Sequence, residues 1–145
     1  MAPPTDTEQL VLAPGLADSI RAQAAASAPR ECCGLLEGWR DGDVWHVQAL
    51  HPAGNLAADA DRFSIDPAAH FAAIRAARLA GRAIIGCYHS HPGGQARPSA
   101  ADLQGAGAED FVWLIAADRE LAAFLYRGGA FLILATGADW VTSSE

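Results

Sequence analysis

The sequence predicts an α/β protein in which a mixed, mostly antiparallel sheet is flanked by helices, as in an α+β sandwich. Two segments carry apolar residues at helical spacing, and apolar runs of strand length lie between them. Three further strand-like runs follow toward the C-terminus and are joined by short turns. The predicted order is α-β-β-α-β-α-β-β-β, preceded by a short edge strand. The 145 residues suit one domain, residues 1–145, with its core at about 8–135.

The first half of the chain begins with a polar lead-in and an edge strand. Pro14 fits the first position of a helix, and Pro29 ends that helix. Two strands joined by a Trp39–Gly42 turn follow the helix. The predicted elements are a strand at 9–12, a helix at 14–27, and strands at 31–37 and 44–50.

The second half opens with a loop at 51–62, which is polar, rich in glycine and proline, and without a period. Asp66 is a good N-cap and Pro67 suits the first helical position, so a helix is expected to run to Ala80 before Gly81. Its predicted inward residues are Phe71, Ile74 and Ala77. The remaining predicted elements are an extended piece at 62–65, a strand at 83–88, a short helix from Ser99, and strands at 111–116, 121–126 and 130–135.

The composition argues against nucleic acid and membranes as partners. The formal net charge is −7, all ten basic residues are arginine, and no basic cluster marks a phosphate-binding surface. The longest apolar run, Phe111–Ala117, is too short to span a bilayer, and the N-terminus lacks the features of a secretory signal. Cys32, Cys33 and Cys87 have apolar neighbours, which indicates buried free thiols in a reducing cytoplasm.

The stretch YHSHPGGQARPSAAD, residues 88–102, has the spacing of a metal site. Strand residues two apart share a face, so His89 and His91 point the same way at the end of a buried strand. Asp102 comes one turn into the next helix and is a candidate third ligand. Two imidazoles and a carboxylate suit zinc, and three protein ligands with one open position are typical of catalytic zinc. Glu31, in an otherwise apolar context, is the best candidate for the general base that hydrolysis needs.

Each of these residues also has a local alternative. Ser99 and Asp102 form the Ser-x-x-acid pattern of a capping box, which explains both without any metal. A His-x-His pair can arise by chance at a strand end, and Glu31 can be a solvated acid at a strand start.

The combined pattern resembles the JAMM motif of the JAB/MPN family of zinc metalloproteases. Glu31 in PRECCGLLEG, followed by His89-x-His91, Ser99 and Asp102, matches all five motif positions at the expected spacing. The strings F-x-I-D-P and G-x-Y-H-S-H-P also fit the family's sequence pattern around the motif positions. The resemblance therefore covers roughly residues 8–135. It implies a fold related to that of cytidine deaminases.

The resemblance also implies a role for each motif residue. His89, His91 and Asp102 would bind Zn²⁺, Glu31 would be the general base toward the zinc-bound water, and Ser99 would donate to the tetrahedral oxyanion. Family members cleave amide or isopeptide bonds after the C-terminal Gly-Gly tail of ubiquitin or ubiquitin-like proteins. This short chain resembles the minimal prokaryotic form, which is associated with ubiquitin-like sulfur carriers.

Five other polar residues are assigned to the fold rather than to chemistry. His46 is expected on a strand face, while His51 and His70 are expected to be solvated. Cys87 is expected in the core, with ligation by its thiol left open. Asn55 lies in the 51–62 loop, which is a candidate wall of the cleft.

Three other functions compete with the zinc peptidase. A non-catalytic scaffold or binding module of the MPN type usually loses motif ligands, and this sequence keeps them all. A zinc deaminase needs His-x-Glu and Pro-Cys-x-x-Cys, and neither string occurs. A metal-free binding domain would use the two histidines only for packing.

Overall fold

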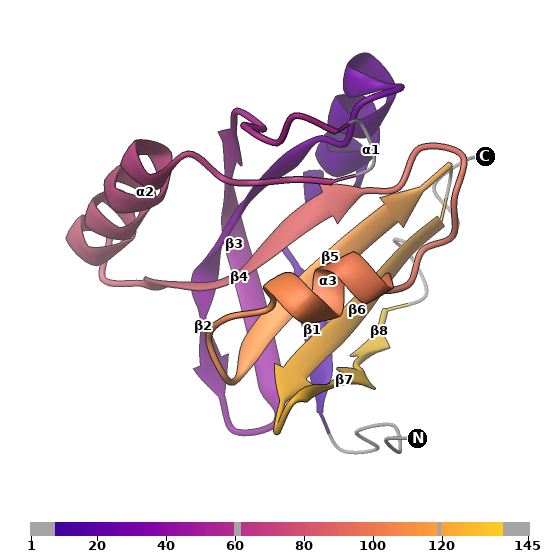
Figure 1. Ribbon diagram of the computed structural model, residues 1–145. Helices are drawn as coiled ribbons and strands as arrows, with labels where there is room; N and C mark the ends of the chain where they lie inside the picture. Colours follow the sequence, from indigo (N-terminus) through magenta and orange to yellow (C-terminus); the bar gives the residue numbers. More distant parts are fainter. Residues whose placement is uncertain (1–7, 60–61, 119, 138–145) are drawn as a thin grey trace.

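The computed structural model describes residues 8–59, 62–118 and 120–137 (Figure 1). Within these ranges the chain forms three helices and eight strands, and the strands make one sheet in the order β7-β6-β5-β4-β2-β3-β1-β8. The helices are α1 (Leu16–Ser27), α2 (Pro67–Leu79) and α3 (Ala100–Gly105). The strands are β1 (Gln9–Leu12), β2 (Cys33–Asp41), β3 (Val44–Ala53), β4 (Ala83–Ser90), β5 (Phe111–Ala117), β6 (Glu120–Arg127), β7 (Ala130–Ile133) and β8 (Ala135–Thr136).

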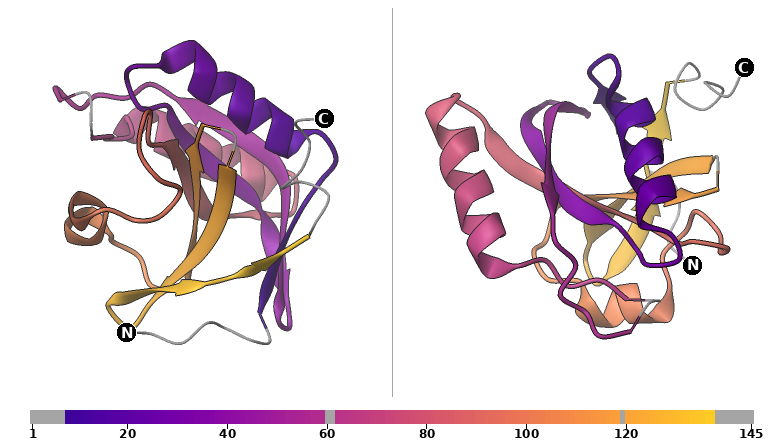
Figure 2. Two further views of the ribbon diagram at one scale, coloured as in Figure 1. Left: turned by 90° about the vertical axis from the view of Figure 1, so that its right-hand side faces the viewer. Right: turned by 90° about the horizontal axis from the view of Figure 1, so that it is seen from above.

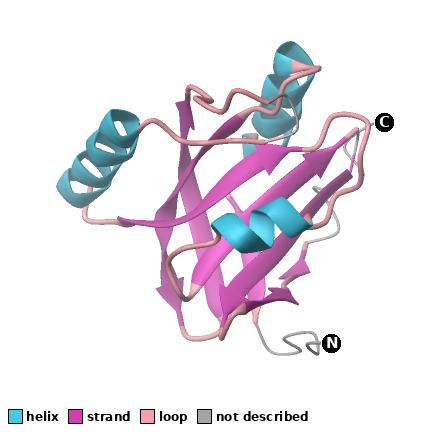
Figure 3. Ribbon diagram, in the orientation of Figure 1, coloured by secondary structure: helices cyan, strands magenta, loops and turns pink. Residues whose placement is uncertain are grey.

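The sheet is mixed and mostly antiparallel, which confirms the predicted fold class (Figure 3). Strand β2 pairs antiparallel with β3 and β4, and β6 pairs antiparallel with β5 and β7. The β1–β3, β1–β8 and β4–β5 pairs are parallel. No helix in the described ranges is long and apolar enough to cross a membrane.

The last segment of the sheet joins its two edges. Strand β7 pairs with β6 at one edge, and after one residue β8 pairs with β1 at the other, so the sheet curls back on itself (Figure 2). The buried Glu8 carboxylate strengthens this closure, since it accepts from Arg127 Nη1 at 2.6 Å and from Trp45 Nε1 at 3.0 Å. One carboxylate therefore ties the residue before β1 to the end of β6 and to β3.

The helices cover opposite faces of the sheet. On one face α1 packs Ile20 into a cluster that includes Leu36 and Tyr88, and burying a side chain such as Ile20 contributes about 1.5–3 kcal/mol. On the other face α2 packs Ala73 against a cluster that includes Cys87. The right-hand view of Figure 2 shows α1 and α2 on the two sides of the strands. Since neighbouring strand residues alternate between faces, Cys87 and His89 share the face of α2.

The predicted helix start at Asp66 is confirmed, because Asp66 Oδ1 accepts from the N–H of Ala68 at 3.0 Å. The predicted inward position of Phe71 is wrong, since its side chain is 72% exposed. The predicted inward position of Ala77 is confirmed, and Ala73 is buried on the same side of the helix. Phe71 lies two residues, about 200° of helix rotation, from Ala73.

The hairpin of β2 and β3 is longer than predicted. Trp39–Asp41 continues β2, so the turn falls at Gly42 and Asp43, and β3 extends through Ala53 into the stretch predicted as loop. Cross-strand contacts explain the extension, because Trp39 stacks on His46 at 4.8 Å and Arg40 lies over Trp45. The run predicted as one strand at 130–135 is divided between β7 and β8.

Candidate metal centre

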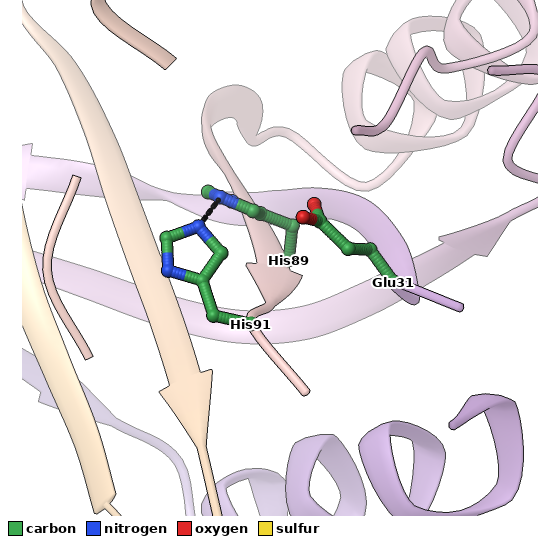
Figure 4. Close-up of side chains that lie close together, drawn as sticks. All are labelled: Glu31, His89 and His91. Carbon is green, nitrogen blue, oxygen red and sulfur yellow. Dashed lines mark hydrogen bonds between the residues drawn. The ribbon is translucent and has the colours of Figure 1, made fainter. Parts of the chain in front are cut away.

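His89 and His91 converge at the carboxyl end of β4. Strand β4 ends at Ser90, and His91 continues its direction because its N–H donates to the Ala116 carbonyl on β5 at 2.7 Å. The two Nε2 atoms lie 3.0 Å apart. His89 is fully buried and His91 is partly exposed. The predicted orientation of both rings toward one point is therefore present in the structure (Figure 4).

Asp102 completes a triangle of donor atoms with the two histidines. Its Oδ2 lies 3.2 Å from His89 Nε2 and 3.1 Å from His91 Nε2. Ligand atoms around a tetrahedral zinc ion lie about 3.3 Å apart, given zinc–ligand distances of about 2.0–2.1 Å. The three atoms thus have the types and the separations that a zinc ion requires, and the residues fit the metal.

Ser99 positions Asp102 through a capping box at the start of α3. Ser99 Oγ accepts from the N–H of Asp102 at 3.0 Å, and Asp102 Oδ2 accepts from the N–H of Ser99 at 2.9 Å. The capping interpretation of this pair is therefore correct, and the same carboxylate also faces both histidines. A carboxylate has about four lone-pair positions, so one interaction does not exclude the other.

Hydrogen bonds and packing set the orientation of each imidazole ring. His91 Nδ1 donates to the Gln95 carbonyl at 2.9 Å, so loss of a proton from the charged ring leaves the lone pair on Nε2, which faces the site. The His89 ring stacks on Phe63 at 4.2 Å and meets the Trp113 edge at 5.6 Å. Among the described residues, His89 Nδ1 is buried without a hydrogen-bond partner, so packing orients this ring.

The charges around the triangle favour an ionised carboxylate. Burial alone would raise the pKa of Asp102, but hydrogen bonds from the two histidines and the Ser99 N–H hold that pKa far below its usual range. Burial lowers the pKa of His89, despite the opposing effect of Asp102. Burial also acts to lower the pKa of His91, but Asp102 and the Gln95 carbonyl outweigh it and raise that pKa. A carboxylate beside a neutral, buried imidazole is the state that binds metal.

Glu31 reaches the same point from the segment that precedes β2. Its side chain is buried, and a carboxylate oxygen lies with ligand atoms of His89 and His91 inside a common 4.8 Å limit (Figure 4). Glu31 is thus close enough to meet a molecule held at the triangle.

Three cavities border side chains of this site. One of about 490 Å³ is lined by Glu31 and Asn55. A cavity of about 440 Å³ is lined by Glu31, His91 and Ser99 together with Pro29 and Pro92. A larger groove of about 680 Å³ runs between α3 and the segment at 62–65 with α2; we call it the α2–α3 groove. Its lining includes Phe63, Ile65, Cys87, Asp102 and Trp113. The groove therefore leads to the carboxylate of the triangle, and the two smaller cavities lead to Glu31.

Of the other polar residues, His51 differs from expectation, while Cys87 and His46 lie as expected. His51 is not simply solvated, because its Nε2 lies 2.7 Å from the buried Glu37 carboxylate, which also accepts from Arg82. Cys87 lies in the core as expected, and all three cysteines are buried and free. His46 lies on a strand face as expected.

Sequence reasoning missed the functions of Phe63 and Asn55. Phe63 contacts His89, and only its place in the F-x-I-D-P string drew attention to it. Asn55 lines a cavity of about 490 Å³ together with Glu31, but it does not line the α2–α3 groove. Its side chain instead bonds to four backbone groups, including the Glu31 carbonyl.

Comparison with known proteins identifies the family. Residues 14–127 match the prokaryotic homologs of the JAB domain. The chain is 34% identical over 139 residues to a desampylase of Haloferax volcanii, covering 92% of this chain and 99% of that one. It is 34% identical over 91 residues to a Thermus thermophilus protein described as "Probable TtuB-protein conjugate cleaving protease", covering 62% of this chain and 58% of that one.

Solved structures share the architecture. The solution structure of a protein from Desulfitobacterium hafniense is 31% identical with a TM-score of 0.81, covering 89% of this chain and 92% of that one. A JAB1/MPN domain protein of Archaeoglobus fulgidus has the same fold at 20% identity and a TM-score of 0.54, covering 91% of this chain and 99% of that one. The fold is thus that of the JAB/MPN class. The chain belongs to the prokaryotic JAB family, which confirms the predicted resemblance.

Proposed function

We propose that this protein is a zinc-dependent peptidase or isopeptidase of the JAMM type. Its proposed substrate is an amide bond that follows the C-terminal Gly-Gly tail of a ubiquitin-like protein or sulfur carrier. The observation that carries the proposal is the triangle of His89 Nε2, His91 Nε2 and Asp102 Oδ2, with the Glu31 carboxylate beside it. The names of two relatives, a desampylase and a conjugate cleaving protease, support this substrate class.

His89, His91 and Asp102 would hold the metal. Bound zinc lowers the pKa of a coordinated water to about 7 and polarises a carbonyl group. Glu31 accepts a proton at its carboxylate and transfers it to the leaving amine, a role that suits a buried carboxylate bordering the cavity of about 440 Å³.

Ser99 would stabilise the negative charge that develops on the substrate carbonyl oxygen. A serine hydroxyl has two acceptor positions and one donor hydrogen. Ser99 Oγ accepts from the Asp102 N–H, so its own hydrogen is available to donate toward the cavity it shares with Glu31 and His91. An oxyanion donor of this kind is held in place before the reaction begins.

The α2–α3 groove is the proposed binding site of the Gly-Gly tail. Phe63 and Trp113 give it apolar walls, and Gly105 and Gly107 keep part of its lining free of side chains. An extended tail without side chains could approach such a wall closely, and Asp102 at the groove would bring the scissile bond to the triangle.

We also propose that one catalytic domain covers about residues 8–135 and that the protein works in the cytoplasm. Three free cysteines support a reducing compartment.

The proposal is tested with a Gly-Gly-ending ubiquitin-like protein joined to a reporter, once by a peptide bond and once through a lysine side chain. Zinc-loaded protein should cut after the second glycine of at least one of the two substrates, as read by intact mass. The Glu31→Gln variant should retain zinc and cut neither. If the fully zinc-loaded wild-type protein leaves both intact, the non-catalytic scaffold becomes the better interpretation.

A further inference from the structure

The peptide group between Glu31 and Cys32 is held at both ends by side chains. Its carbonyl, which belongs to Glu31, accepts from Asn55 Nδ2 at 3.0 Å. Its N–H, which belongs to Cys32, donates to Ser90 Oγ at 2.8 Å. A peptide group is planar, so two bonds at opposite ends fix its orientation. The orientation of this plane sets ψ of Glu31 and with it the direction of the Glu31 side chain.

Ser90 adds a second bond to the same stretch of chain. Its N–H donates to the Cys32 carbonyl at 3.1 Å, so β4 holds the residue after Glu31 through both backbone and side chain. Ser90 lies between His89 and His91. The two histidines and the Glu31 backbone are therefore positioned by one short piece of β4.

Asn55 uses all the hydrogen-bonding positions of its amide. Its Nδ2 donates to the carbonyls of Glu31 and Arg62, the latter at 2.8 Å. Its Oδ1 accepts from the N–H groups of Ala57 at 2.9 Å and Ser64 at 3.0 Å. An asparagine amide has two donor hydrogens and two acceptor positions, so this side chain is fully satisfied.

The bonds of Asn55 link Glu31 to the wall of the α2–α3 groove. The segment at 62–65 lines that groove, and Asn55 itself bridges to Ile65. Phe63, in the same segment, stacks on His89. A displacement of this segment would therefore reach the Glu31 carbonyl through one side chain and the His89 ring through another.

We propose that Asn55 is a positioning residue for Glu31 that couples the wall of the α2–α3 groove to the proposed general base. The proposal rests on the proposed function, since it assumes that Glu31 moves a proton. The hydrogen bonds of Asn55 go to backbone groups of Glu31, Arg62, Ala57 and Ser64, not to the side chains of the triangle. Asn55 acts by fixing the Glu31–Cys32 peptide plane, and a displacement of about 1 Å at a reacting group can lower the rate roughly 100-fold.

Two variants at position 55 separate the bonds that Asn55 donates from the bonds that it accepts. Asn55→Ala removes every bond of the side chain. Asn55→Asp keeps the acceptors for Ala57 and Ser64 but cannot donate to the Glu31 carbonyl. Leu56→Ala is the matched control, because this neighbouring side chain in the same loop is 60% exposed and lines none of the three cavities.

The first readout is the division of the effect between kcat and KM in the zinc-loaded protein. Both Asn55 variants should lower kcat by about 10- to 100-fold with zinc content unchanged. KM should stay within twofold in Asn55→Asp, because the aspartate still accepts from Ser64 in the groove wall. The Leu56→Ala control should match wild type. A rise in KM at unchanged kcat would overturn the proposal, because Asn55 would then shape only the groove.

The second readout needs no substrate and no metal. Amide hydrogen exchange at Cys32 should become at least about 10-fold faster in both variants, because its peptide group has lost the hydrogen bond from Asn55 to the Glu31 carbonyl. The N–H groups of Ala57 and Ser64 should stay protected in Asn55→Asp alone, and Leu36 in the core should not change. Should Asn55→Ala fail to fold, Asn55→Asp supplies both readouts.

The exchange readout also distinguishes this proposal from the proposed function. If wild-type protein cleaves no substrate, the proposed function fails, and Cys32 exchange still decides whether Asn55 holds the Glu31 peptide. Unchanged Cys32 exchange in both variants would overturn the positioning role whatever the activity shows.

Discussion

Ser99 and Asp102 each accept a hydrogen bond from the other's backbone, at 3.0 Å and 2.9 Å, and the Asp102 oxygen that does so lies 3.1 Å from His91 Nε2. A helix start thereby fixes the direction of a carboxylate. Because Ser99 borders the same cavity as Glu31, the residue that caps α3 is also available to a bound substrate.

Changing Ser99 should separate its capping role from its proposed chemical role. Ser99→Ala should cost about 0.5–2 kcal/mol of stability through loss of the cap. It should also lower kcat by roughly 10²–10³ through loss of an oxyanion donor. Ser99→Asn caps about equally well and stays neutral, so its melting temperature should remain near wild type while activity falls. Thermal unfolding and steady-state kinetics measure the two effects. Wild-type turnover by folded Ser99→Ala would show that this serine is only a cap.

Replacing Glu31 by glutamine should abolish turnover without loss of zinc. The amide has nearly the same size as the carboxylate but cannot accept the proton, and general-base catalysis contributes about 10²–10⁴-fold. Kinetics and elemental analysis on the same preparation give both numbers. An active Glu31→Gln variant would remove this residue from the mechanism.

Glu8 should stabilise the closed sheet in a pH-dependent way. Burial would raise its pKa, but the hydrogen bond from Arg127, which is the largest effect, lowers it together with Trp45 and Arg40. A lowered folded-state pKa means that the stabilisation is present above the unfolded pKa, about 4.3, and is lost as pH falls through the folded value. Glu8→Gln should therefore lose about 1–3 kcal/mol at pH 7 and much less at pH 3.

Urea unfolding at the two pH values measures this difference. Glu120→Gln, which changes an exposed carboxylate on β6, is the control and should have little effect at either pH. An equal loss at pH 3 and pH 7 for Glu8→Gln would mean that packing rather than charge is responsible.

Local rules were sufficient to predict most of the site. The two-residue period of a strand places His89 and His91 on one face, and the capping pattern places Asp102 one turn into α3. The contacts of Asn55 could not be predicted in this way. Its partner Glu31 lies 24 residues away, and a loop without a period carries no signal for such a pairing.

Local rules could not predict which side of α2 faces the sheet, nor how the two edges of the sheet are joined. Alanines occur on every side of α2, so only packing against the sheet decides that Ala73 is buried and Phe71 is exposed. The split between β7 and β8 depends on pairing with β1, a strand more than one hundred residues earlier in the chain.

Zinc binding by three purified proteins tests most directly which side chain is the third ligand, because two sets of three ligands include both histidines. Titration of the metal-free chains should give one zinc per chain for wild type and for Glu31→Gln, with similar affinities. Asp102→Asn, which keeps an oxygen for the capping box, should bind zinc at least about 10- to 100-fold more weakly. Loss of zinc from Glu31→Gln, with zinc retained at full affinity by Asp102→Asn, would show that Glu31 and not Asp102 is the third ligand.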